Sequence, residues 1–553
     1  MATNAQVRTG TPVVQGIALG PVVRPAPGID LGELPGPRTD AEGEKQRYAD
    51  AVAAVSERLR ARARAATGVA AEVLLAQVAL VGDKGLRKSA ARLIDAGAGA
   101  EQAMDGAAGQ FVEMFTKLGG LMAERTTDLC DLRSRVIAEL LGRPEPGVPS
   151  PDVPSVLMAD DLAPADTATL DPATTIALVT RLGGPTSHTA IIARQLGVPC
   201  IVAAPVGDIP AGTTVLVDGG SGTITIDPDP AEAQALIARD RATRAAAAAF
   251  TGPGGTQDGH RVQVLANVQD GPSAERARRG AAEGVGLFRS ELAFLGRDHE
   301  PTVEQQSEVY GAVLRAFEGR KVVIRTLDAG SDKPMKFANL AHEDNPALGV
   351  RGSRLAVANP GLMSRQLDAI ADAAARTAQS PWVMAPMIAT AAEAADFARQ
   401  VRERSLTPGV MVEIPSAALR ARELLQHVDF LSIGTNDLSQ YTMAADRLSA
   451  DLAELTDPWQ PAVLQLIEMT ARAGAEAGKP VGVCGEAAAD AMLACVLVGL
   501  GVTSLSMAAS AVGTVGAAVA GVSLEQCRRA AGAALEAASP AAARAGAAEA
   551  LGR

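Results

Sequence analysis

The 553-residue sequence predicts a multidomain α/β protein, in which a small α/β domain with an inserted α-helical bundle precedes a C-terminal (β/α)8 barrel. Two observations support the small domain. Strand-like segments lie on both sides of a long stretch with helical periodicity, and proline-rich sequence follows that stretch. A third observation supports the barrel, because strand-like and helical segments alternate through the rest of the chain.

The small domain is predicted to combine residues near the N-terminus with residues beyond the proline-rich joint. Residues 11–24 have the texture of short strands and turns. Strand-like segments resume after the joint, at residues 155–158, 175–180, 199–203, 214–218 and 223–227. The simplest topology assigns residues 1–30 plus 144–228 to one α/β domain.

The segment between these two pieces is predicted to be helical. From about residue 40 to residue 142, apolar side chains such as Leu59, Leu86 and Phe115 recur at spacings near three and four. We therefore expect residues 31–143 to form an inserted helical domain. Residues 229–255 are expected to form a linker, with a helix from 231 to about 250.

Residues 256–553 are predicted to form a TIM-like barrel. Eight strand-like apolar segments alternate there with helical ones, which is the number that a (β/α)8 barrel requires. The segments are Val262–Val268, Gly284–Glu291, Val322–Asp328, Trp382–Met387, Val410–Ile414, Phe430–Asp437, Pro480–Glu486 and Ser504–Ala508.

Composition limits the classes of partner and environment. A net charge of −12 argues against a nucleic-acid-binding protein, which normally carries a basic patch. The five cysteines lack metal-type spacing and no secretory leader opens the chain, so we expect a reducing cytoplasm. The uncharged stretch Ala491–Leu524 is long enough to cross a bilayer, but glycine, serine and threonine interrupt it. Buried barrel elements are therefore expected there, with a membrane span as the alternative.

A lone histidine, His188, lies where a flexible turn gives way to an apolar helix. The sequence around it is Gly-Gly-Pro-Thr-Ser-His-Thr-Ala-Ile-Ile-Ala-Arg-Gln, residues 183–195. The start of a helix offers unpaired backbone N–H groups and the positive end of the helix dipole, which favour an anion. An imidazole there is well placed to carry a phosphoryl group. The alternative is a histidine that merely caps a surface helix, and this motif alone does not decide between them.

Reactive side chains gather where the predicted barrel strands end, the edge at which such barrels place their active sites. Three guanidinium groups, from Arg289, Arg325 and Arg447, suit a polyanionic substrate, because arginine presents paired donors to phosphate and carboxylate. Arg351 is a candidate fourth. The alternative for any one of them is a salt bridge within a loop, but burying several together without a ligand would leave charges poorly compensated.

Two carboxylates and a thiol complete the candidate site. Glu413 and Asp437 offer two hard oxygen ligands, which matches Mg²⁺, an ion that keeps waters and takes further ligands from a phosphorylated substrate. The alternative is that each carboxylate is paired to an arginine. Cys484 follows a strand beside a glycine turn and Glu486. Its thiol could donate a proton to carbon, or it could be inert packing, as buried cysteines usually are.

Taken together, these motifs resemble the phosphoenolpyruvate-utilising enzyme family, in particular the enzyme I branch that serves the sugar phosphotransferase system. The resemblance covers nearly the whole chain. Its most specific parts are the His188 motif quoted above, Glu-Gly-Val-Gly-Leu-Phe-Arg-Ser-Glu around Arg289, Ser-Ile-Gly-Thr-Asn-Asp-Leu-Ser-Gln-Tyr around Asp437, and Val-Cys-Gly-Glu around Cys484.

The resemblance implies a role for each candidate residue. His188 would be phosphorylated at Nε2, and Cys484 would donate a proton to the enolate. The phosphoenolpyruvate contacts would be Arg289, Arg325, Asn436, Asp437 and Arg447, and the Mg²⁺ ligands would be Glu413 and Asp437. The helical insertion would dock the histidine phosphocarrier protein HPr, and the barrel would form a homodimer. The small domain would be the swivelling phosphohistidine domain.

A few positions differ from the usual family pattern, and none of them removes a reactive group. Pro185 and Val350 replace a more familiar arginine and tryptophan, and the loop Gly330-Ser331-Asp332-Lys333 lacks a second glycine. A pyruvate phosphate dikinase or phosphoenolpyruvate synthase is the nearest alternative, but it needs an ATP-binding domain ahead of the histidine domain. The residues before His188 are mainly helical and contain no glycine-rich phosphate loop. A non-catalytic phosphoenolpyruvate-sensing scaffold is the other alternative.

Overall fold

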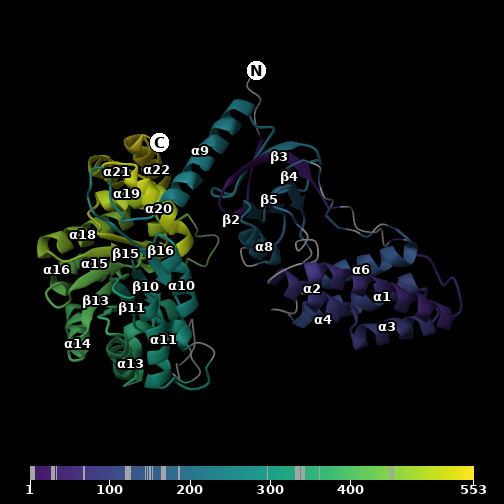
Figure 1. The fold of residues 1–553 in the computed structure, drawn as a ribbon, viewed down its shortest axis with the longest axis horizontal. Coiled ribbons are helices and arrows are strands. Elements are labelled where there is room, and N and C mark those ends of the chain that lie inside the picture. Colours follow the sequence, from purple (N-terminus) through teal and green to yellow (C-terminus); the bar gives the residue numbers. More distant parts are fainter. Residues whose placement is uncertain are drawn as a thin grey trace. The chain divides into compact units, whose positions relative to one another are not determined.

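The fold was analysed in a computed structural model, shown in Figure 1. The structure describes residues 6–25, 32, 34–65, 69–118, 126–143, 145, 147–148, 151, 153–162, 170–184, 187–294, 297–330, 337, 343–359, 361–447, 449, 452 and 454–552. The chain forms two compact units, Met1–Arg241 and Ala242–Arg553. The division falls within helix α9 (Pro230–Ala249), which lies where the sequence predicts the linker helix.

The first unit contains an eight-stranded sheet in the order β1-β8-β7-β3-β4-β5-β6-β2. Its strands are β1 (Gln6–Thr9), β2 (Thr11–Val14), β3 (Ile17–Val23), β4 (Ser155–Ala159), β5 (Thr175–Thr180), β6 (Cys200–Val202), β7 (Thr214–Asp218) and β8 (Thr223–Ile226). Strand β3 pairs in parallel with β4, which follows it only after the helical insertion. The prediction that both flanking pieces build one sheet is therefore confirmed.

The central strands of this sheet are apolar on both faces. Val156, Met158 and Val179 belong to one buried cluster, whereas the alternate residues Leu157 and Leu178 belong to another. Since successive side chains of a strand point to opposite faces, the sheet is covered on both sides. Helix α8 (His188–Leu196) covers one face, because its Ala193 packs in the cluster that contains Leu157 and Leu178.

The predicted helical insertion is confirmed as a set of helices with its own core. The helices are α1 (Ala41–Ala65), α2 (Val69–Val81), α3 (Lys84–Asp95), α4 (Ala100–Leu118) and α6 (Thr126–Leu141). Leu59, Leu86 and Met104 are among the side chains buried between them, as their periodicity predicts. The expected domain boundaries at 30/31 and 143/144 fall on or beside residues outside the described part of the chain, so they stay predictions.

The second unit is a closed barrel of eight parallel strands, in the order β10-β11-β12-β13-β14-β15-β16-β9. The strands are β9 (Gln263–Val268), β10 (Val285–Arg289), β11 (Val322–Arg325), β12 (Trp382–Ala385), β13 (Thr407–Val412), β14 (Phe430–Ile433), β15 (Val481–Val483) and β16 (Ser504–Ala508). Each corresponds to one of the eight segments predicted from the sequence.

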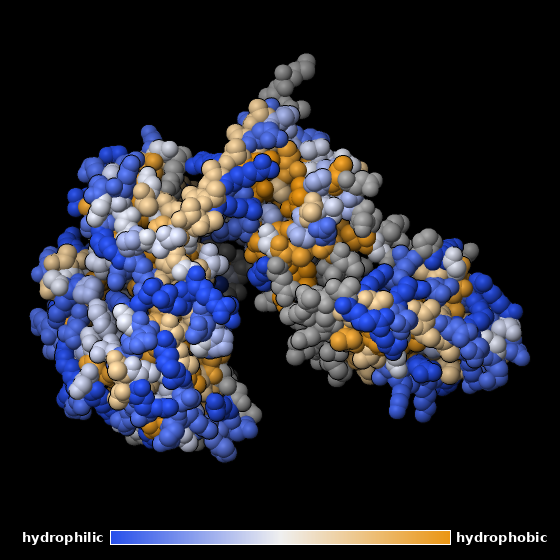
Figure 2. All heavy atoms as spheres, in the orientation of Figure 1, coloured by the Kyte–Doolittle hydropathy of each residue, from blue (hydrophilic) through white to orange (hydrophobic). Residues whose placement is uncertain are grey.

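Helices follow the strands and surround the barrel (Figure 1). They are α10 (Gly271–Arg279), α11 (Val303–Ala316), α12 (Leu355–Ala358), α13 (Leu362–Thr377), α14 (Ala391–Arg402), α15 (Pro415–Leu419), α16 (Ala421–Leu424), α17 (Thr435–Met443), α18 (Pro461–Ala477), α19 (Ala491–Gly499), α20 (Val512–Ala520), α21 (Leu524–Glu536) and α22 (Pro540–Leu551). On the face that Figure 2 shows, hydrophilic side chains cover much of this unit, as expected for helices whose apolar faces turn inward.

The uncharged stretch Ala491–Leu524 forms separate barrel elements. It contains α19, β16 and α20, and side chains such as Leu493 and Leu505 belong to the main apolar core of the barrel. No helix in the described part of the chain combines the length and the apolar character that a membrane span needs. The expectation of buried barrel elements is confirmed.

Candidate active site

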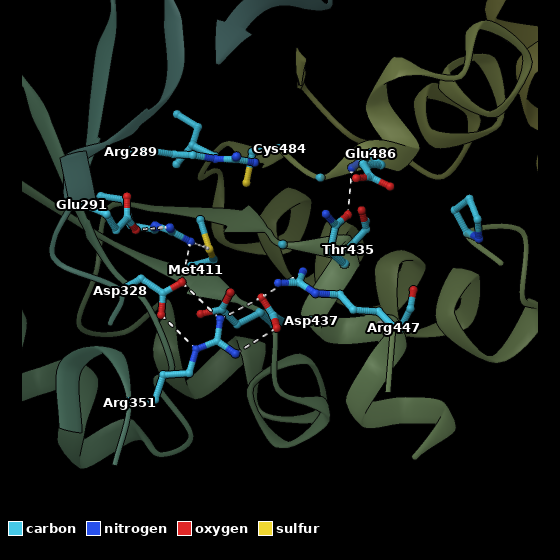
Figure 3. A pocket seen from close by; sticks show the side chains of 18 of the residues that line it. Arg289, Glu291, Asp328, Arg351, Met411, Thr435, Asp437, Arg447, Cys484 and Glu486 are labelled. Atoms are coloured by element: carbon cyan, nitrogen blue, oxygen red, sulfur yellow. Dashed lines mark hydrogen bonds and ion pairs between the residues drawn. The ribbon is translucent and has the colours of Figure 1, made fainter. Parts of the chain in front are cut away.

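A cavity of about 590 Å³ opens at the carboxyl ends of the barrel strands (Figure 3). The residues that line it come from the ends of several strands and from the segments that follow them. Among them are Arg289, Glu291, Arg325, Asp328, Arg351, Met411, Glu413, Thr435, Asn436, Asp437, Arg447, Cys484 and Glu486. The cavity therefore brings together every barrel residue that the sequence predicts to act in the site.

The two-residue period of a strand explains why these side chains point inward. Leu287, Val323 and Met411 belong to one buried cluster inside the barrel, on β10, β11 and β13. The residues two positions further along each chain segment lie on the same side. These residues are Arg289, Arg325 and Glu413. Over two residues along each of these chain segments, the inward-facing side chains thus change from apolar ones in the core to charged ones in the cavity.

Arg325 is buried and held by acidic partners. Its guanidinium group forms ion pairs with Glu291 and with Asp328, the latter at 3.0 Å between Nη1 and Oδ2. The same group lies 3.7 Å from Sδ of Met411. Three polar atoms here are buried without a hydrogen-bond partner among the described residues: Nε of Arg325, Oε2 of Glu291 and the hydroxyl of Thr435. Unpaired buried polar atoms are costly, so a polar ligand in this cavity would relieve them.

Arg351 is only 2% exposed and is occupied by two carboxylates. Its Nε and Nη2 atoms lie 3.1 Å from the carboxylate oxygens of Asp328, and Nη1 and Nη2 lie 3.1 Å from those of Asp437. Figure 3 shows these ion pairs as a bridge between the two acids. Arg351 also lines the cavity, so its role as a fourth arginine for the substrate stays a prediction.

The more exposed guanidinium groups belong to Arg289 and Arg447. Arg289 ends β10 and is exposed, and the Arg447 side chain is 32% exposed, with Nη1 3.8 Å from Oδ2 of Asp437. Asn436 accepts a hydrogen bond from the backbone N–H of Glu486 at 2.9 Å, which ties the β14 and β15 ends together. These two arginines can reach a bound anion, whereas Arg325 and Arg351 supply positive charge from deeper in the wall.

Glu413 lies at the end of β13 and is 1% exposed. Its Oε1 accepts a hydrogen bond of 2.7 Å from the backbone N–H of Met387. Burial, together with the nearby charges of Asp328 and Asp437, raises the pKa of Glu413 to about 8. The alternative that each carboxylate is paired to an arginine therefore describes Asp437, whereas Glu413 accepts its hydrogen bond from a backbone N–H.

The donor set fits a divalent cation that takes part of its coordination from elsewhere. The nearby charges of Asp328 and Asp437 help to raise the pKa of Glu413, and a cation would compensate its carboxylate. Among the described residues, no group of three or more histidine, cysteine, aspartate and glutamate side chains is placed to hold a metal ion. Further ligands would have to come from substrate and water, as is usual for Mg²⁺.

Cys484 follows β15 and is buried at the inner wall of the cavity. Its Sγ–H donates to the carbonyl oxygen of Ile433 at 3.5 Å, and its own carbonyl accepts a hydrogen bond of 3.1 Å from Asn267. Burial raises the pKa of the thiol, so the group keeps its proton. A protonated thiol at this position has the chemistry that a proton donor needs.

His188 is the first residue of α8, in the other unit. The side chain of Ser187 caps this helix by accepting a hydrogen bond of 3.3 Å from the backbone N–H of Ala190. Gly183 has a φ of 89°, a conformation that L-residues rarely adopt, so a glycine suits this turn. The predicted turn-to-helix transition is confirmed, while Pro185 and Thr186 lie outside the described residues, as do Ser331, Asp332 and Lys333 of the loop after β11.

Sequence reasoning did not assign three residues that shape the cavity. Glu291 and Asp328 hold Arg325, and Thr435 presents a hydroxyl without a partner in the described structure. Asp328 is the last residue of the predicted segment Val322–Asp328 and lies three positions beyond Arg325, which is the one available signal. For Thr435 the sequence offers only its place beside Asn436.

Three regions of the chain match known protein families. Residues 244–524 match the PEP-binding domain of PEP-utilising enzymes, residues 9–125 match their N-terminal domain, and residues 151–222 match their mobile domain.

Curated relatives extend over almost the whole chain. A phosphoenolpyruvate-protein phosphotransferase from Streptomyces coelicolor is 48% identical over 532 residues, which cover 95% of each chain. Proteins of the same name from Haloferax volcanii and Bacillus subtilis are 39% and 35% identical, and these matches cover 91% and 86% of this chain and 92% and 87% of theirs. The chain therefore belongs to the PEP-utilising enzymes and, within them, to the phosphoenolpyruvate-protein phosphotransferases.

Proposed function

We propose that this chain transfers the phosphoryl group of phosphoenolpyruvate to its own His188 and then to a histidine of HPr, releasing pyruvate. This would be the first step of sugar uptake by the phosphotransferase system. The observation that carries the proposal is the cavity at the barrel mouth, which brings together two exposed arginines, a third that is buried in the wall, two carboxylates and a protonated thiol. The membership of the chain in its family supports the same reaction.

Phosphoenolpyruvate presents a phosphate and a carboxylate, and the cavity offers donors for both. Arg289 and Arg447 are exposed enough to pair with these groups directly, and Arg325 adds charge from the wall. Asn436 and Asp437 lie beside them in the cavity lining. Binding therefore depends on positioned guanidinium groups, which also stabilise charge on the phosphoryl group during transfer.

Glu413 and Asp437 are the residues that would hold Mg²⁺. When bound, the ion supplies positive charge to the transferring phosphoryl group. The arrangement of the two carboxylates supports this assignment, because each is buried and each lines the cavity that takes the substrate.

The reaction is an in-line displacement at phosphorus. Neutral His188 attacks with Nε2, a P–N bond forms, and the P–O bond to the enolate oxygen breaks, so the electron pair leaves with the enolate. The thiol of Cys484 then gives its proton to the terminal carbon of the enolate, which yields pyruvate and a thiolate that recovers a proton from water. Protonation at carbon removes the enolate and drives the transfer forward.

The parts of the chain divide the work in this proposal. Residues 1–30 and 144–228 form the swivelling phosphohistidine domain, and residues 31–143 dock HPr. Residues 229–255 act as the linker, and residues 256–553 bind phosphoenolpyruvate and form the homodimer. We place the reaction in the cytoplasm, in keeping with a sequence whose five cysteines suggest no disulfide framework.

The test is transfer of label from [³²P]phosphoenolpyruvate in the presence of Mg²⁺. We expect the wild-type chain to take up label, to pass it to added HPr and to release pyruvate, whereas His188→Ala takes up none. Label uptake by His188→Ala would contradict the assignment. Labelling of His188 by ATP would favour a dikinase-like or synthase-like enzyme, and phosphoenolpyruvate binding without pyruvate release would favour a non-catalytic scaffold.

A further inference from the structure

Gln366 lies on α13, is 1% exposed and takes no part in lining the cavity. Both ends of its side-chain amide are nevertheless engaged. Nε2 donates to the hydroxyl oxygens of Ser290 at 3.1 Å and Tyr310 at 3.0 Å. Oε1 accepts from the backbone N–H of Leu327 at 2.9 Å. A buried amide with three such bonds is a fixed point in the structure.

Two of these partners, Ser290 and Leu327, lie just after the strands that present arginines to the cavity. Ser290 directly follows Arg289, and its hydroxyl donates to the carbonyl oxygen of Arg325 at 2.8 Å. Leu327 lies two residues beyond Arg325 and directly before Asp328. Arg289 and Arg325 are themselves paired in register between β10 and β11. One amide thus ties together the two strand ends from which both guanidinium groups extend.

The direction of the hydrogen bonds leaves one consistent arrangement. The backbone N–H of Leu327 can only donate, so Oε1 must face it and Nε2 must face Ser290 and Tyr310. The Tyr310 hydroxyl then donates to Oε1 of Gln306 at 3.2 Å, and its ring packs edge-on against Phe288 with the ring centres 5.8 Å apart. Phe288 precedes Arg289 on β10, so the network supports that strand end from a second side.

We infer that Gln366 is a positioning residue, which sets the spacing of Arg289 and Arg325 for phosphoenolpyruvate without touching it. The inference rests on the proposed function. Loss of the amide frees the β10 and β11 ends from each other and leaves buried polar partners unsatisfied. Because substrate and transition state use the same two arginines, the loss weakens the binding of both, which raises KM more than it lowers the saturated rate.

The test compares Gln366→Met with Gln306→Met. Methionine keeps the side-chain volume and removes the amide. Gln306 is a matched control, because it is equally buried in the same network but bonds Tyr310 and the carbonyl of Pro301 rather than the β10 and β11 ends. For Gln366→Met we expect the KM for phosphoenolpyruvate to rise about tenfold, equivalent to about 1.4 kcal/mol, with the saturated rate of His188 phosphorylation within about threefold of wild type. For Gln306→Met we expect comparable loss of thermal stability and an unchanged KM.

A second measurement separates this inference from the proposed function. Calorimetric binding of phosphoenolpyruvate with Mg²⁺, in a His188→Ala background that cannot turn over, should show the same tenfold loss for Gln366→Met. Failure of the wild-type chain to be phosphorylated overturns the proposed function. Wild-type phosphorylation together with equal KM values for the two methionine variants overturns the positioning role. If Gln366→Met does not fold, the KM for phosphoenolpyruvate is measured for Ser290→Ala instead. An unchanged KM in that variant overturns the inference, and a raised KM supports it.

Discussion

Replacing Arg351 by methionine removes the bridge between Asp328 and Asp437. The guanidinium group makes four contacts of 3.1 Å with these acids, and all three residues are buried. Removing one partner of a buried ion pair costs about 3–5 kcal/mol, because it leaves an uncompensated buried charge. Asp328 keeps Arg325 at 3.0 Å, and Asp437 keeps Arg447 at 3.8 Å, so we expect the lower end, about 3 kcal/mol.

The assay for this variant is urea unfolding followed by tryptophan fluorescence. The chain has two tryptophans, Trp382 and Trp459, and both belong to the barrel unit, so the signal reports the barrel alone. Arg354→Met is the matched control, because Arg354 donates from Nη1 to the carbonyl oxygen of Gly349 at 3.2 Å, its one side-chain hydrogen bond among the described residues and one to a neutral partner. We expect the control to lose less than about 1 kcal/mol. Equal losses for the two variants would refute the argument that Arg351 compensates two buried carboxylates.

Three further predictions concern the cavity wall. With a chelator present, the stability of the barrel should fall as the pH rises from the ordinary pKa of 4.5 through the folded pKa of Glu413, about 8, because only the folded state holds the proton in that range. The free energy of unfolding should fall by at most about 1.4 kcal/mol per pH unit. In Glu413→Gln, unfolding at about pH 5 and about pH 8 should no longer show this fall. If the variant kept the same pH dependence as the wild type, Glu413 would not be the group that titrates. Gly485→Ala places a Cβ 1.9 Å from the hydroxyl oxygen and 2.7 Å from the backbone nitrogen of Thr435, so the cavity wall must shift. We therefore expect phosphorylation of His188 to slow by about tenfold or more. The control Gly532→Ala, with open space around it, should not change the rate. Cys484→Ala should slow pyruvate formation by about 10²–10⁴-fold. Cys495→Ala should leave the rate unchanged, because the Cys495 thiol is buried outside the cavity lining. Equal rates for the two variants would contradict the role of Cys484 as the proton donor.

The fold could be predicted almost entirely from local pattern. Every barrel strand overlaps a segment that its apolar run predicted, because a strand buried on both faces is continuously hydrophobic; β13 begins three residues before its predicted segment. The charged cavity followed from one rule, that polar residues after parallel barrel strands meet at one edge. His188 was predicted to lie where a flexible turn gives way to an apolar helix, and in the structure helix α8 begins at this residue, with Ser187 as its cap.

The pairing of charges within the cavity could not be predicted from the sequence. Arg325 and Arg351 look alike as residues near strand ends, yet the ion pairs described for Arg351 are formed with Asp328 and Asp437. Which carboxylate an arginine meets depends on loop paths that bring Arg351 to a residue far along the chain. Gln366 carried no signal at all, because a glutamine on one face of a helix is usually solvated and its partners lie on three other segments of the chain.

The central claim is that the barrel mouth delivers a phosphoryl group from phosphoenolpyruvate to His188 and to no other residue. The chain has five histidines, so His260, His299, His342 and His427 are internal controls. The most direct measurement is intact-mass analysis after mixing with phosphoenolpyruvate and Mg²⁺, followed by peptide mapping at alkaline pH, where phosphohistidine survives. We predict the mass of one phosphoryl group per chain, located on the peptide that contains His188 and removed by added HPr. Phosphate on any of the other four histidines, or none on the chain, would contradict the account.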